Sequence, residues 1–298
     1  MYISLIGCGK ISHRHVSAIN DHPSLKLLSA CDINSEMRKI FSEKYNVPVF
    51  SNIEEMVNAK LADIVVVLTS SGTHFKIYNQ VKKYFDKIII EKPLALKLED
   101  ARRIIEDEKS GKKIFIVKQN RFNKPVILCK ELIDEGLLGD LFLGSIRVRW
   151  CRTQSYYDSS DWRGTWSRDG GVLSNQAIHH IDLLLYLMGK YKSVNAITKT
   201  FGSKIEVEDT AVAQVEFQNN SLGLIEATTA TRPIDLEGSI SLLGSKGSID
   251  IGGFAVNLLR RLELNDERTK RYYSERINQF SENPKEIDSF AHKEFYKR

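Results

Sequence analysis

Glu91-Lys92-Pro93 places a lysine where it could act as a base. The tripeptide follows residues 87–90, an apolar run typical of a buried strand, and open α/β sheets bind their ligands at the carboxyl ends of their strands. Proline disfavours helix and favours an extended or turned backbone, or a cis bond, which aims the ammonium in one direction. Because burial or a nearby cation lowers the pKa of a lysine, Lys92 is a candidate for proton abstraction; a surface lysine in a turn is the alternative.

A second group, Asn175, His179 and Asp182, has the spacing of one helix face. Residues three or four apart are neighbours on a helix, so Asp182 can hold one ring nitrogen of His179 or support the backbone. His180 lies about 100° around the same helix and is expected to pack or to face solvent. A histidine between an amide and a carboxylate is a candidate for proton transfer.

The segment Gly7-Cys8-Gly9-Lys10-Ile11-Ser12 joins a strand-like run to a helix-like one. Gly7 permits a tight turn and Gly9 lets the backbone approach a pyrophosphate at a helix N-terminus, whereas Ser12 stands where a third glycine is usual. Asp32 ends the second expected strand, where its carboxylate could accept hydrogen bonds from a ribose and favour NAD over NADP. An ordinary turn and a helix N-cap at Asp32 are the alternatives.

The aromatic loop, residues 152–169, is longer than a connector needs to be, and such loops are usually functional or disordered. Its tryptophans argue against disorder. Arg163 could grip a carboxylate or a phosphate with two hydrogen bonds, and a nearby ring could stack on a sugar or a base. Just before this loop, Arg147 and Arg149 alternate with apolar residues, which predicts a half-solvated sheet face that could also join subunits.

No metal site is expected. His13, His15, His179, His180 and Asp182 could be collected as ligands, but no spacing among them matches a zinc-binding helix. None of the four cysteines forms a C-x-x-C pair, which argues against both a zinc site and a disulfide framework.

These residues lie in two regions of the chain that have different patterns of helices and strands. The first 120 residues alternate short β-branched runs with helix-like segments, which is typical of a parallel sheet covered by helices on both faces. The expected strands there are 3–6, 25–31, 48–50, 64–69, 87–90 and 113–117. The rest combines helices at 125–135 and 171–188 with strands at 141–151, 211–217, 222–229, 239–243 and 256–264. We therefore expect a dinucleotide-binding α/β domain at 1–120 and an α+β domain at 121–298 with a large open, mainly antiparallel sheet.

Composition bounds the class of protein. The 298 residues are 42% apolar and 27% charged, a length that suggests two domains. The formal net charge of +5 is too small and too dispersed to predict nucleic-acid binding. No apolar run reaches a membrane span, and no charged leader precedes the first strand. We expect a cytoplasmic protein that binds neither membrane nor nucleic acid.

Together the motifs resemble the Gfo/Idh/MocA family of NAD(P)-dependent sugar oxidoreductases over nearly the whole chain. The resemblance rests on the glycine segment, on Glu91-Lys92-Pro93-Leu94 and on Gly170-Gly171-x-Leu173-x-Asn175-x-x-x-His179-x-x-Asp182-Leu183-Leu184. Within the family the chain is most similar to the UDP-N-acetylglucosaminuronate 3-dehydrogenases of bacterial surface-polysaccharide synthesis. The segments that carry this narrower resemblance are Val117-Lys118-Gln119-Asn120-Arg121-Phe122-Asn123, Tyr156-Tyr157-Asp158, Trp162-Arg163-Gly164-Thr165-Trp166 and Asn175-Gln176.

The resemblance implies a Rossmann domain and a second domain whose sheet often joins subunits, so we expect a homo-oligomer, either a dimer or a tetramer. Carried over by position, the residues that would contact NAD are Gly7, Cys8, Gly9, Lys10, Ile11, Asp32, Thr69, Ser70, His74, Glu91, Lys92 and Gln119. Those that would contact substrate are Asn120, Arg121, Tyr156, Arg163, Trp166 and Asn175. Lys92 would orient the substrate, and His179 would take or give the hydroxyl proton.

Two features depart from the family pattern. Many members have aspartate where this chain has Asn175, and an amide cannot be a base, so proton removal shifts to Lys92 or His179. Members usually continue past the region matching 290–296, so we expect a final helix to be missing from this sequence.

The expected reaction is oxidation of a secondary alcohol, C3 of a UDP-linked amino-uronic acid, by NAD⁺. The implied partners are this nucleotide sugar and, for recycling of the cofactor, 2-oxoglutarate. Another sugar or cyclitol dehydrogenase of the same family and a non-catalytic NAD(P)-binding sensor are the alternatives.

Overall fold

The structure, a computed structural model, describes residues 1–253, 255–278 and 290–297 and divides them into two compact units. The first unit contains Met1–Lys118, Ser167–Asp169 and the last described helix, α10 (Phe290–Lys297). The second contains the described residues of Gln119–Trp166 and Gly170–Asp288. The expected division at residue 120 lies close to this one, but the expected second domain, 121–298, differs because 167–169 and α10 pack with the first unit.

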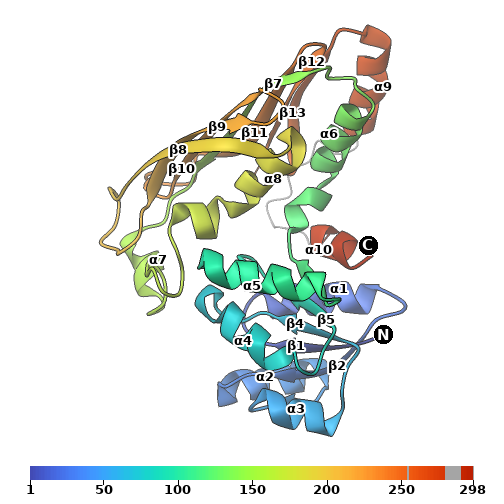
Figure 1. The fold of residues 1–298 in the computed structure, drawn as a ribbon, viewed down its shortest axis with the longest axis vertical. Coiled ribbons are helices and arrows are strands. Elements are labelled where there is room, and N and C mark those ends of the chain that lie inside the picture. Colours follow the sequence, from blue (N-terminus) through green and yellow to red (C-terminus); the bar gives the residue numbers. More distant parts are fainter. Residues whose placement is uncertain (254, 279–289, 298) are drawn as a thin grey trace. The chain divides into compact units, whose positions relative to one another are not determined.

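The first unit is built on a six-stranded sheet in the order β3-β2-β1-β4-β5-β6, in which every pairing is parallel (Figure 1). This is the strand order of a dinucleotide-binding fold. Its strands are β1 (Tyr2–Ile6), β2 (Lys26–Cys31), β3 (Val49–Phe50), β4 (Ile64–Val67), β5 (Lys87–Ile90) and β6 (Lys113–Ile116). The expected parallel sheet is confirmed.

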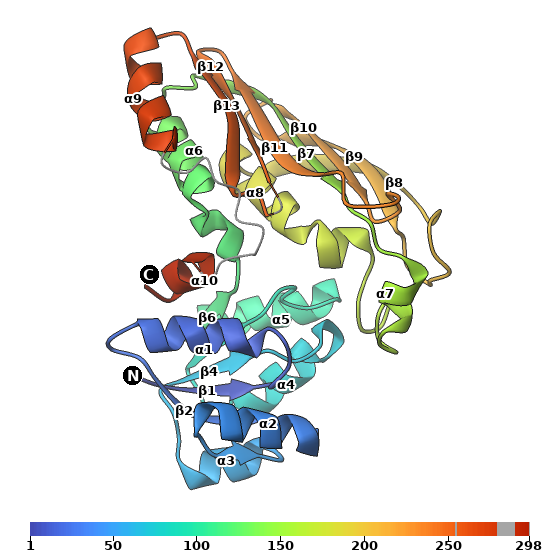
Figure 2. The same ribbon diagram turned by 180° about the vertical axis from the view of Figure 1, so that it is seen from behind.

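Helices cover both faces of this sheet because its strands are apolar on both sides. The elements involved are α1 (Ser12–Asp21), α2 (Ser35–Tyr45), α3 (Ile53–Ala59), η1 (Ser71–Thr73), α4 (His74–Val81) and α5 (Leu98–Lys109). One core cluster joins Val16 of α1 and Phe41 of α2 to Leu5, and Tyr296 of α10 packs against it. The other cluster joins residues of α3, α4 and α5 to the opposite side of the strands. Helix α10 therefore lies beside α1 and completes one layer of the first unit (Figure 2).

The second unit is built on a seven-stranded sheet in the order β13-β12-β11-β7-β10-β9-β8. Its strands are β7 (Leu141–Arg149), β8 (Tyr191–Lys199), β9 (Thr210–Phe217), β10 (Leu222–Thr228), β11 (Glu237–Gly244), β12 (Gly247–Gly252) and β13 (Leu258–Leu264). The β7–β10 pair is parallel and the other five pairs are antiparallel. The expected open, mainly antiparallel sheet is confirmed.

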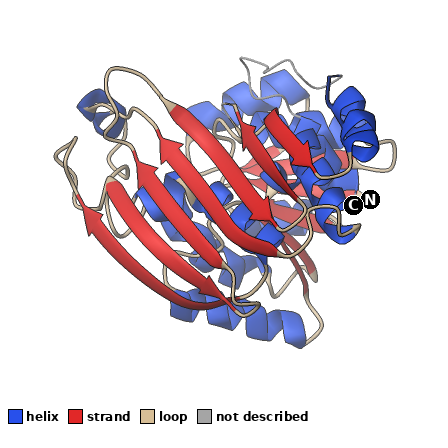
Figure 3. Cartoon of the chain, turned by 90° about the horizontal axis from the view of Figure 1, so that it is seen from above, coloured by secondary structure: helices blue, strands red, loops and turns tan. Residues whose placement is uncertain are grey.

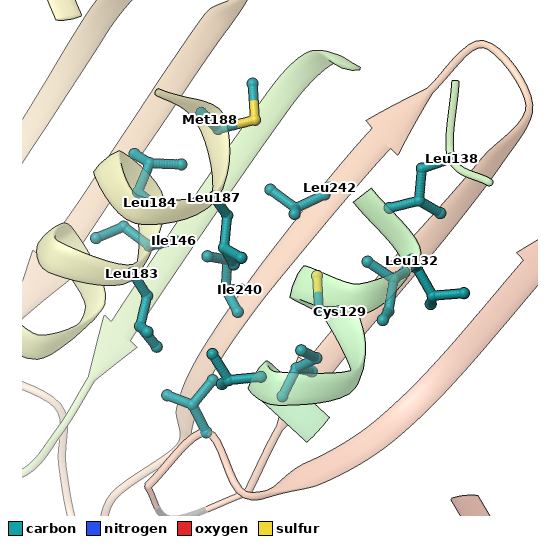
Figure 4. Close-up of a cluster of buried hydrophobic side chains, with 14 of the residues drawn as sticks. Cys129, Leu132, Leu138, Ile146, Leu183, Leu184, Leu187, Met188, Ile240 and Leu242 are labelled. Atoms are coloured by element: carbon teal, nitrogen blue, oxygen red, sulfur yellow. The ribbon is translucent and has the colours of Figure 1, made fainter. Parts of the chain in front are cut away.

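The helical elements of the second unit are η2 (Gln119–Phe122), α6 (Lys124–Asp134), α7 (Gln154–Asp158), η3 (Val172–Gln176), α8 (Ile178–Met188) and α9 (Glu267–Asn278). Apolar side chains of α6 and α8 point at the inner face of the sheet, where Leu132, Leu183 and Leu184 meet Ile146 and Ile240 (Figure 4). Burying one such side chain contributes about 1.5–3 kcal/mol to stability. No helix of the described residues lies over the other face of the sheet (Figure 3).

The observed elements differ from the expected ones in several places, and α7 and α9 were not expected. The helix expected at 171–188 is two pieces, a π-helical turn over Val172–Gln176 and then α8. The strands β8 and β12 were not expected; every residue of β8 is exposed, so this edge strand has none of the alternation that reveals a half-buried strand. No helix among the described residues is long and apolar enough to cross a membrane.

Candidate functional site

The turn that follows β1 requires glycine at its first position. Gly7 has φ +104°, and a Cβ there would lie 2.8 Å from the carbonyl oxygen of Leu68. The Gly7 N–H donates to the carbonyl oxygen of Cys31 at 2.8 Å, which fixes the turn against β2. At Gly9, by contrast, a Cβ would have no atom within 4 Å, so the backbone is open on that side to a ligand.

Ser12 takes the place of the usual third glycine, at the start of α1. It is fully buried, its N–H donates to the carbonyl oxygen of Gly9 at 3.0 Å, and its hydroxyl donates to the same oxygen at 2.6 Å. The serine therefore closes the loop instead of disturbing it. Lys10 is exposed and Ile11 is partly buried, both just before the helix N-terminus, where free N–H groups favour an anion.

Asp32, just after β2, is tied to the glycine turn. Its Oδ2 accepts a hydrogen bond from the Cys8 N–H at 2.7 Å, and its Oδ1 accepts one from the Asn34 N–H at 2.8 Å. The N-cap of α2 is Asn34, not Asp32. Burial raises the pKa of the Cys8 thiol to about 12, with Asp32 acting in the same direction, so the thiol stays protonated. The open backbone at Gly9 and the carboxylate at the end of β2 fit a bound NAD.

His74, expected to line the cofactor, instead braces two loops of the first unit. The ring is 1% exposed, with Nε2 2.9 Å from the carbonyl oxygen of Thr69 and Nδ1 2.6 Å from that of Pro93. Burial lowers the pKa of His74. Thr69 and Ser70 are partly buried in the loop that His74 holds, after β4.

Lys92 follows β5 and forms a cis peptide bond with Pro93. Burial lowers the pKa of Lys92 below its usual value, and the nearby charge of Lys118 acts in the same direction. Glu91 and Asp169 oppose this shift without cancelling it. The buried Asp169 was not anticipated, because nothing in the sequence links the end of the aromatic loop to Lys92.

Glu91 was expected near the cofactor, but its side chain lies inside the first unit, 7% exposed. Its Oε1 is 2.9 Å from His15 Nε2, and its Oε2 accepts the Lys92 backbone N–H at 2.9 Å. Among the described residues, His15, Glu91 and His292 are the one group whose ligand atoms, all within 4.8 Å of one another, could hold a metal. The 2.9 Å contact is a hydrogen bond that joins His15 to Glu91, whereas neither ring nitrogen of His292 has a hydrogen-bond partner among the described residues.

In the second unit Arg121 and Asp182 form a pair with two hydrogen bonds. Arg121 Nε and Nη2 each donate to one carboxylate oxygen of Asp182 at 2.7 Å. The guanidinium also lies over the Tyr186 ring, 4.6 Å from its centre. Asp182, expected to hold His179 or the backbone, thus holds Arg121, and Arg121, expected to contact substrate, is engaged within the unit. The pair lines a surface cavity of about 710 Å³ with Tyr186, Lys190 and Gln218.

His179 lies near the start of α8, where its Nε2 is 3.4 Å from the Nε2 of Gln119. Gln119 was expected to contact the cofactor, and the structure brings it to the proposed proton-transfer residue. Asn120, the next residue of the same short helix, is 8% exposed.

Glu208, which sequence reasoning missed, shapes the start of the segment that carries Asn175. A Cβ at Gly171 would lie 1.8 Å from the Glu208 carboxylate, so a larger residue there would require this side chain to move. The backbone oxygen of Glu208 accepts from Val172 at 3.0 Å, and its Oε1 accepts from Leu173 at 3.2 Å. Glu208 therefore accepts hydrogen bonds from the first N–H groups of this segment. The segment starts with a π-helical turn and not with the expected helix.

The aromatic loop is ordered by its own side chains. The Arg163 guanidinium lies over the rings of Tyr156 and Trp162, at 4.2 and 4.6 Å, and donates to the Tyr156 hydroxyl. Gln176 donates to that same hydroxyl at 3.1 Å. Arg163 is therefore held between two rings, whereas Trp166 is 61% exposed.

His180, on α8, is buried as completely as the hydrophobic core residues around it. It is 1% exposed, lies edge-on to Trp150 at 5.7 Å, and neither ring nitrogen has a hydrogen-bond partner among the described residues. Burial lowers its pKa to about 4. The expectation of packing rather than chemistry agrees with this position.

The chain matches two family models that together cover most of its length. Residues 1–119 match a model described as the oxidoreductase family with an NAD-binding Rossmann fold, and residues 126–250 match the GFO/IDH/MocA C-terminal domain. Among curated relatives, the myo-inositol 2-dehydrogenase of Thermotoga maritima is 27% identical over 281 residues, 91% of this chain and 80% of that protein.

Two similar solved structures are WlbA dehydrogenases crystallised with NADH and UDP-GlcNAcA. The protein from Chromobacterium violaceum is 35% identical, with a TM-score of 0.87 over 95% of this chain and 83% of that one. The protein from Bordetella pertussis is 34% identical, with a TM-score of 0.86 over 100% of this chain and 86% of that one.

Proposed function

The chain belongs to the Gfo/Idh/MocA family of oxidoreductases, and from this premise we propose that it oxidises the C3 hydroxyl of a UDP-linked N-acetylamino-uronic acid. At the coarser level it is an NAD-dependent dehydrogenase of sugars or cyclitols. We assign the finer reaction to bacterial surface-polysaccharide biosynthesis, in the cytoplasm.

The observation that carries the substrate proposal is the identity of 34–35%, over nearly the whole chain, to two dehydrogenases crystallised with UDP-GlcNAcA. The identity to the inositol dehydrogenase is 27%. Oxidation at C3 is proposed from the resemblance of the segments around Gln119, Tyr156 and Arg163 to 3-dehydrogenases.

Each unit supplies one part of the proposed chemistry. In the first unit Gly7, Gly9 and Asp32 would hold NAD, which when bound accepts the hydride from the carbon being oxidised. Lys92 would remove the hydroxyl proton, because its lowered pKa leaves more of the amine uncharged near neutral pH. In the second unit His179, with Gln119 beside it, would contact a substrate hydroxyl. Asn175 can hydrogen-bond a substrate but cannot take its proton.

A cyclitol or a different sugar is the second candidate, favoured by the similarity to the inositol dehydrogenase. A non-catalytic NAD sensor is disfavoured, since such a protein has no use for a lysine whose pKa is lowered by burial beside the cofactor loop.

The deciding experiment is a screen of NADH formation at 340 nm with UDP-N-acetylglucosaminuronic acid, myo-inositol and free glucosides, each with and without 2-oxoglutarate. We expect turnover on the UDP-sugar acid. If 2-oxoglutarate re-oxidises the cofactor, it should lower the absorbance at 340 nm while raising the amount of ketone formed, which mass spectrometry measures. Trapping the ketone with borodeuteride and locating the deuterium by NMR then identifies the oxidised carbon. Turnover on free polyols alone would exclude the UDP-sugar proposal, and deuterium elsewhere than C3 would exclude the position.

We further propose that the chain forms a dimer or tetramer through the uncovered face of the second sheet. Val212, Leu222 and Leu224 are 45–57% exposed on neighbouring strands of that face, while Arg149 is paired with Glu226. A surface of exposed aliphatic side chains whose neighbouring charges are already paired can pack against the same surface of a second copy of the chain. Light scattering after size exclusion should give an oligomer that Leu222→Asp with Leu224→Asp dissociates; a monomeric wild-type protein would contradict the proposal.

A further inference from the structure

A buried polar cluster in the first unit joins three segments that are far apart in the sequence. It contains His15 of α1, Glu91 after β5, and His292 and Tyr296 of α10. His15 Nδ1 is 2.8 Å from the Tyr296 hydroxyl and its Nε2 is 2.9 Å from Glu91 Oε1, while His292 Nε2 is 3.9 Å from the same oxygen. Both histidines are 0% exposed.

The cluster keeps a buried carboxylate charged. Burial alone would raise the pKa of Glu91, but its contacts with His15 and His292 hold that pKa well below the usual range. A buried carboxylate without such partners would be strongly unfavourable. The ionised state of Glu91 therefore depends on α10.

The two oxygens of this carboxylate have different partners. Oε1 faces the histidines, whereas Oε2 accepts the backbone N–H of Lys92 at 2.9 Å. The position and charge of the Glu91 side chain thus act directly on the residue that we assign as the base. The charged groups that act on Lys92 are Glu91, Asp169 and Lys118. Those that act on His292 are Glu91, His15 and Arg14.

We propose that His292 is a positioning residue for Lys92, and that it acts through Glu91. The proposal rests on the proposed function only in treating Lys92 as the base; its physical content is that the last described helix controls the ionisation and placement of a lysine more than 190 residues away in the sequence. Without His292, Oε1 keeps the His15 hydrogen bond but loses the second imidazole, 3.9 Å away, that stabilises its charge. The carboxylate can then shift and take up a proton more readily, so it opposes the lowered pKa of Lys92 less.

The test is a double-mutant cycle between His292→Phe, which keeps a ring but no nitrogen, and Glu91→Gln, which keeps the shape but no charge. We expect His292→Phe to lower kcat by about tenfold, with the KM for NAD within about twofold, because the reacting group is misplaced while the cofactor turn is intact. The acid limb of the kcat profile should move to lower pH. Glu91→Gln should move it in the same direction, and adding His292→Phe to Glu91→Gln should produce no further shift. His292→Gln, which retains a donor, should recover part of the loss.

A second readout does not depend on the substrate. Competitive labelling of amines with acetic anhydride as a function of pH, followed by mass spectrometry, reports the pKa of Lys92 itself, and His292→Phe should lower that pKa. Lys297→Ala, on the exposed end of the same helix, is the matched control and should leave both readouts unchanged.

Three results would overturn the proposal. His292→Phe could lower the melting temperature while kcat, its pH profile and the labelling pKa stay unchanged, which would make the role structural. The shift could persist in the Glu91→Gln background, which would exclude action through Glu91. One equivalent of metal in the purified protein, lost in His292→Phe, would make the cluster a metal site. If instead Lys92→Met keeps full activity while the labelling shift is present, the proposed function fails and the coupling of His292 to Lys92 stands.

Discussion

The two units hold their candidate functional residues in different ways. In the first unit, hydrogen bonds with backbone groups position three of these side chains. The Cys8 N–H donates to Asp32, the Lys92 N–H donates to Glu91, and backbone carbonyl oxygens contact His74. In the second, side chains from distant segments hold one another, as Arg121 holds Asp182 across 61 residues and Gln119 meets His179 across 60. Motifs of the first kind can be recognised in a sequence, whereas pairs of the second kind become visible only once the chain has folded.

This difference predicts where a substitution affects chemistry and where it affects stability. Where the site is open, water can bind to a backbone N–H or carbonyl that has lost its side-chain partner, so the loss of a residue held in this way should be felt mainly in binding or catalysis. A residue held by a side chain leaves that partner unpaired, so its loss should be felt in the free energy of unfolding.

The largest effect is expected at Lys92. Lys92→Met keeps the length and packing of the side chain but removes the amine, so kcat should fall by about 10³-fold while the dissociation constant for NADH, measured by fluorescence, changes little. Exposed Lys97→Met is the control. A variant with wild-type kcat would show that Lys92 is not the base and would transfer that role to His179.

The next effect contrasts the buried histidines of the two units. His15 has Glu91 and Tyr296 as partners, whereas His180 lies against Trp150 with no hydrogen-bond partner among the described residues. Since the pKa of His180 falls from 6.5 to about 4 on folding, the unfolded state binds the proton first as the pH drops. The second unit should therefore keep its full stability above pH 6.5 and lose about 3 kcal/mol as the pH falls to 4.

Fluorescence can follow this loss separately, because Trp150, Trp162 and Trp166 all lie in the second unit. His180→Phe should flatten the dependence of its unfolding free energy on pH, whereas His22→Phe, in the first unit, should not. An unchanged pH dependence in His180→Phe would mean that another group is responsible.

A smaller effect is expected at Asp32. Asp32→Ser removes the charge that we expect to accept from the ribose, which should weaken NAD binding by about 30-fold, or about 2 kcal/mol. NADP should gain relative to NAD, because the Arg38 guanidinium donates to the carbonyl oxygens of Asp32 and Ile33 and remains beside the site. Calorimetric titration with both cofactors measures the ratio; an unchanged ratio would show that Asp32 does not select the cofactor.

The sequence predicted most of the first unit and rather less of the second. The parallel strands and the glycine turn follow from local patterns, and each expected strand of the first sheet lies within two residues of the observed one. The strand β8 was missed because its residues are exposed throughout, and the break before α8 was missed because Glu208, which takes the first N–H groups, lies more than 30 residues away. Likewise, nothing local indicates that α10 packs on α1.

The site residues show the same contrast between features set by local patterns and contacts between distant segments. The positions of Asp32 at the end of β2 and of Lys92 after β5 follow from local patterns, although the lowered pKa of Lys92 comes from its burial in the folded unit. The partners of Arg121 and Arg163 do not follow from local patterns, because a guanidinium pairs with whichever carboxylate or ring the fold brings to it. Both arginines were expected to grip substrate, and both are engaged within the second unit.

The smallest predicted effect tests the pairing of Arg121 with Asp182. Asp182 has 12% of its side chain exposed and Arg121 has 36%, so solvent screens their pair in part, and Arg121→Met should lower the unfolding free energy of the second unit by only about 1 kcal/mol. Asp182→Leu should cost a similar amount, because it leaves the guanidinium without its bidentate partner. The double variant should lose less than the sum, since neither charge is then left alone. Tryptophan fluorescence during urea unfolding measures all three. Additive losses, together with a KM for the sugar that rises in Arg121→Met but not in Asp182→Leu, would show that Arg121 serves the substrate after all and would remove one of the pairs that set the second unit apart from the first.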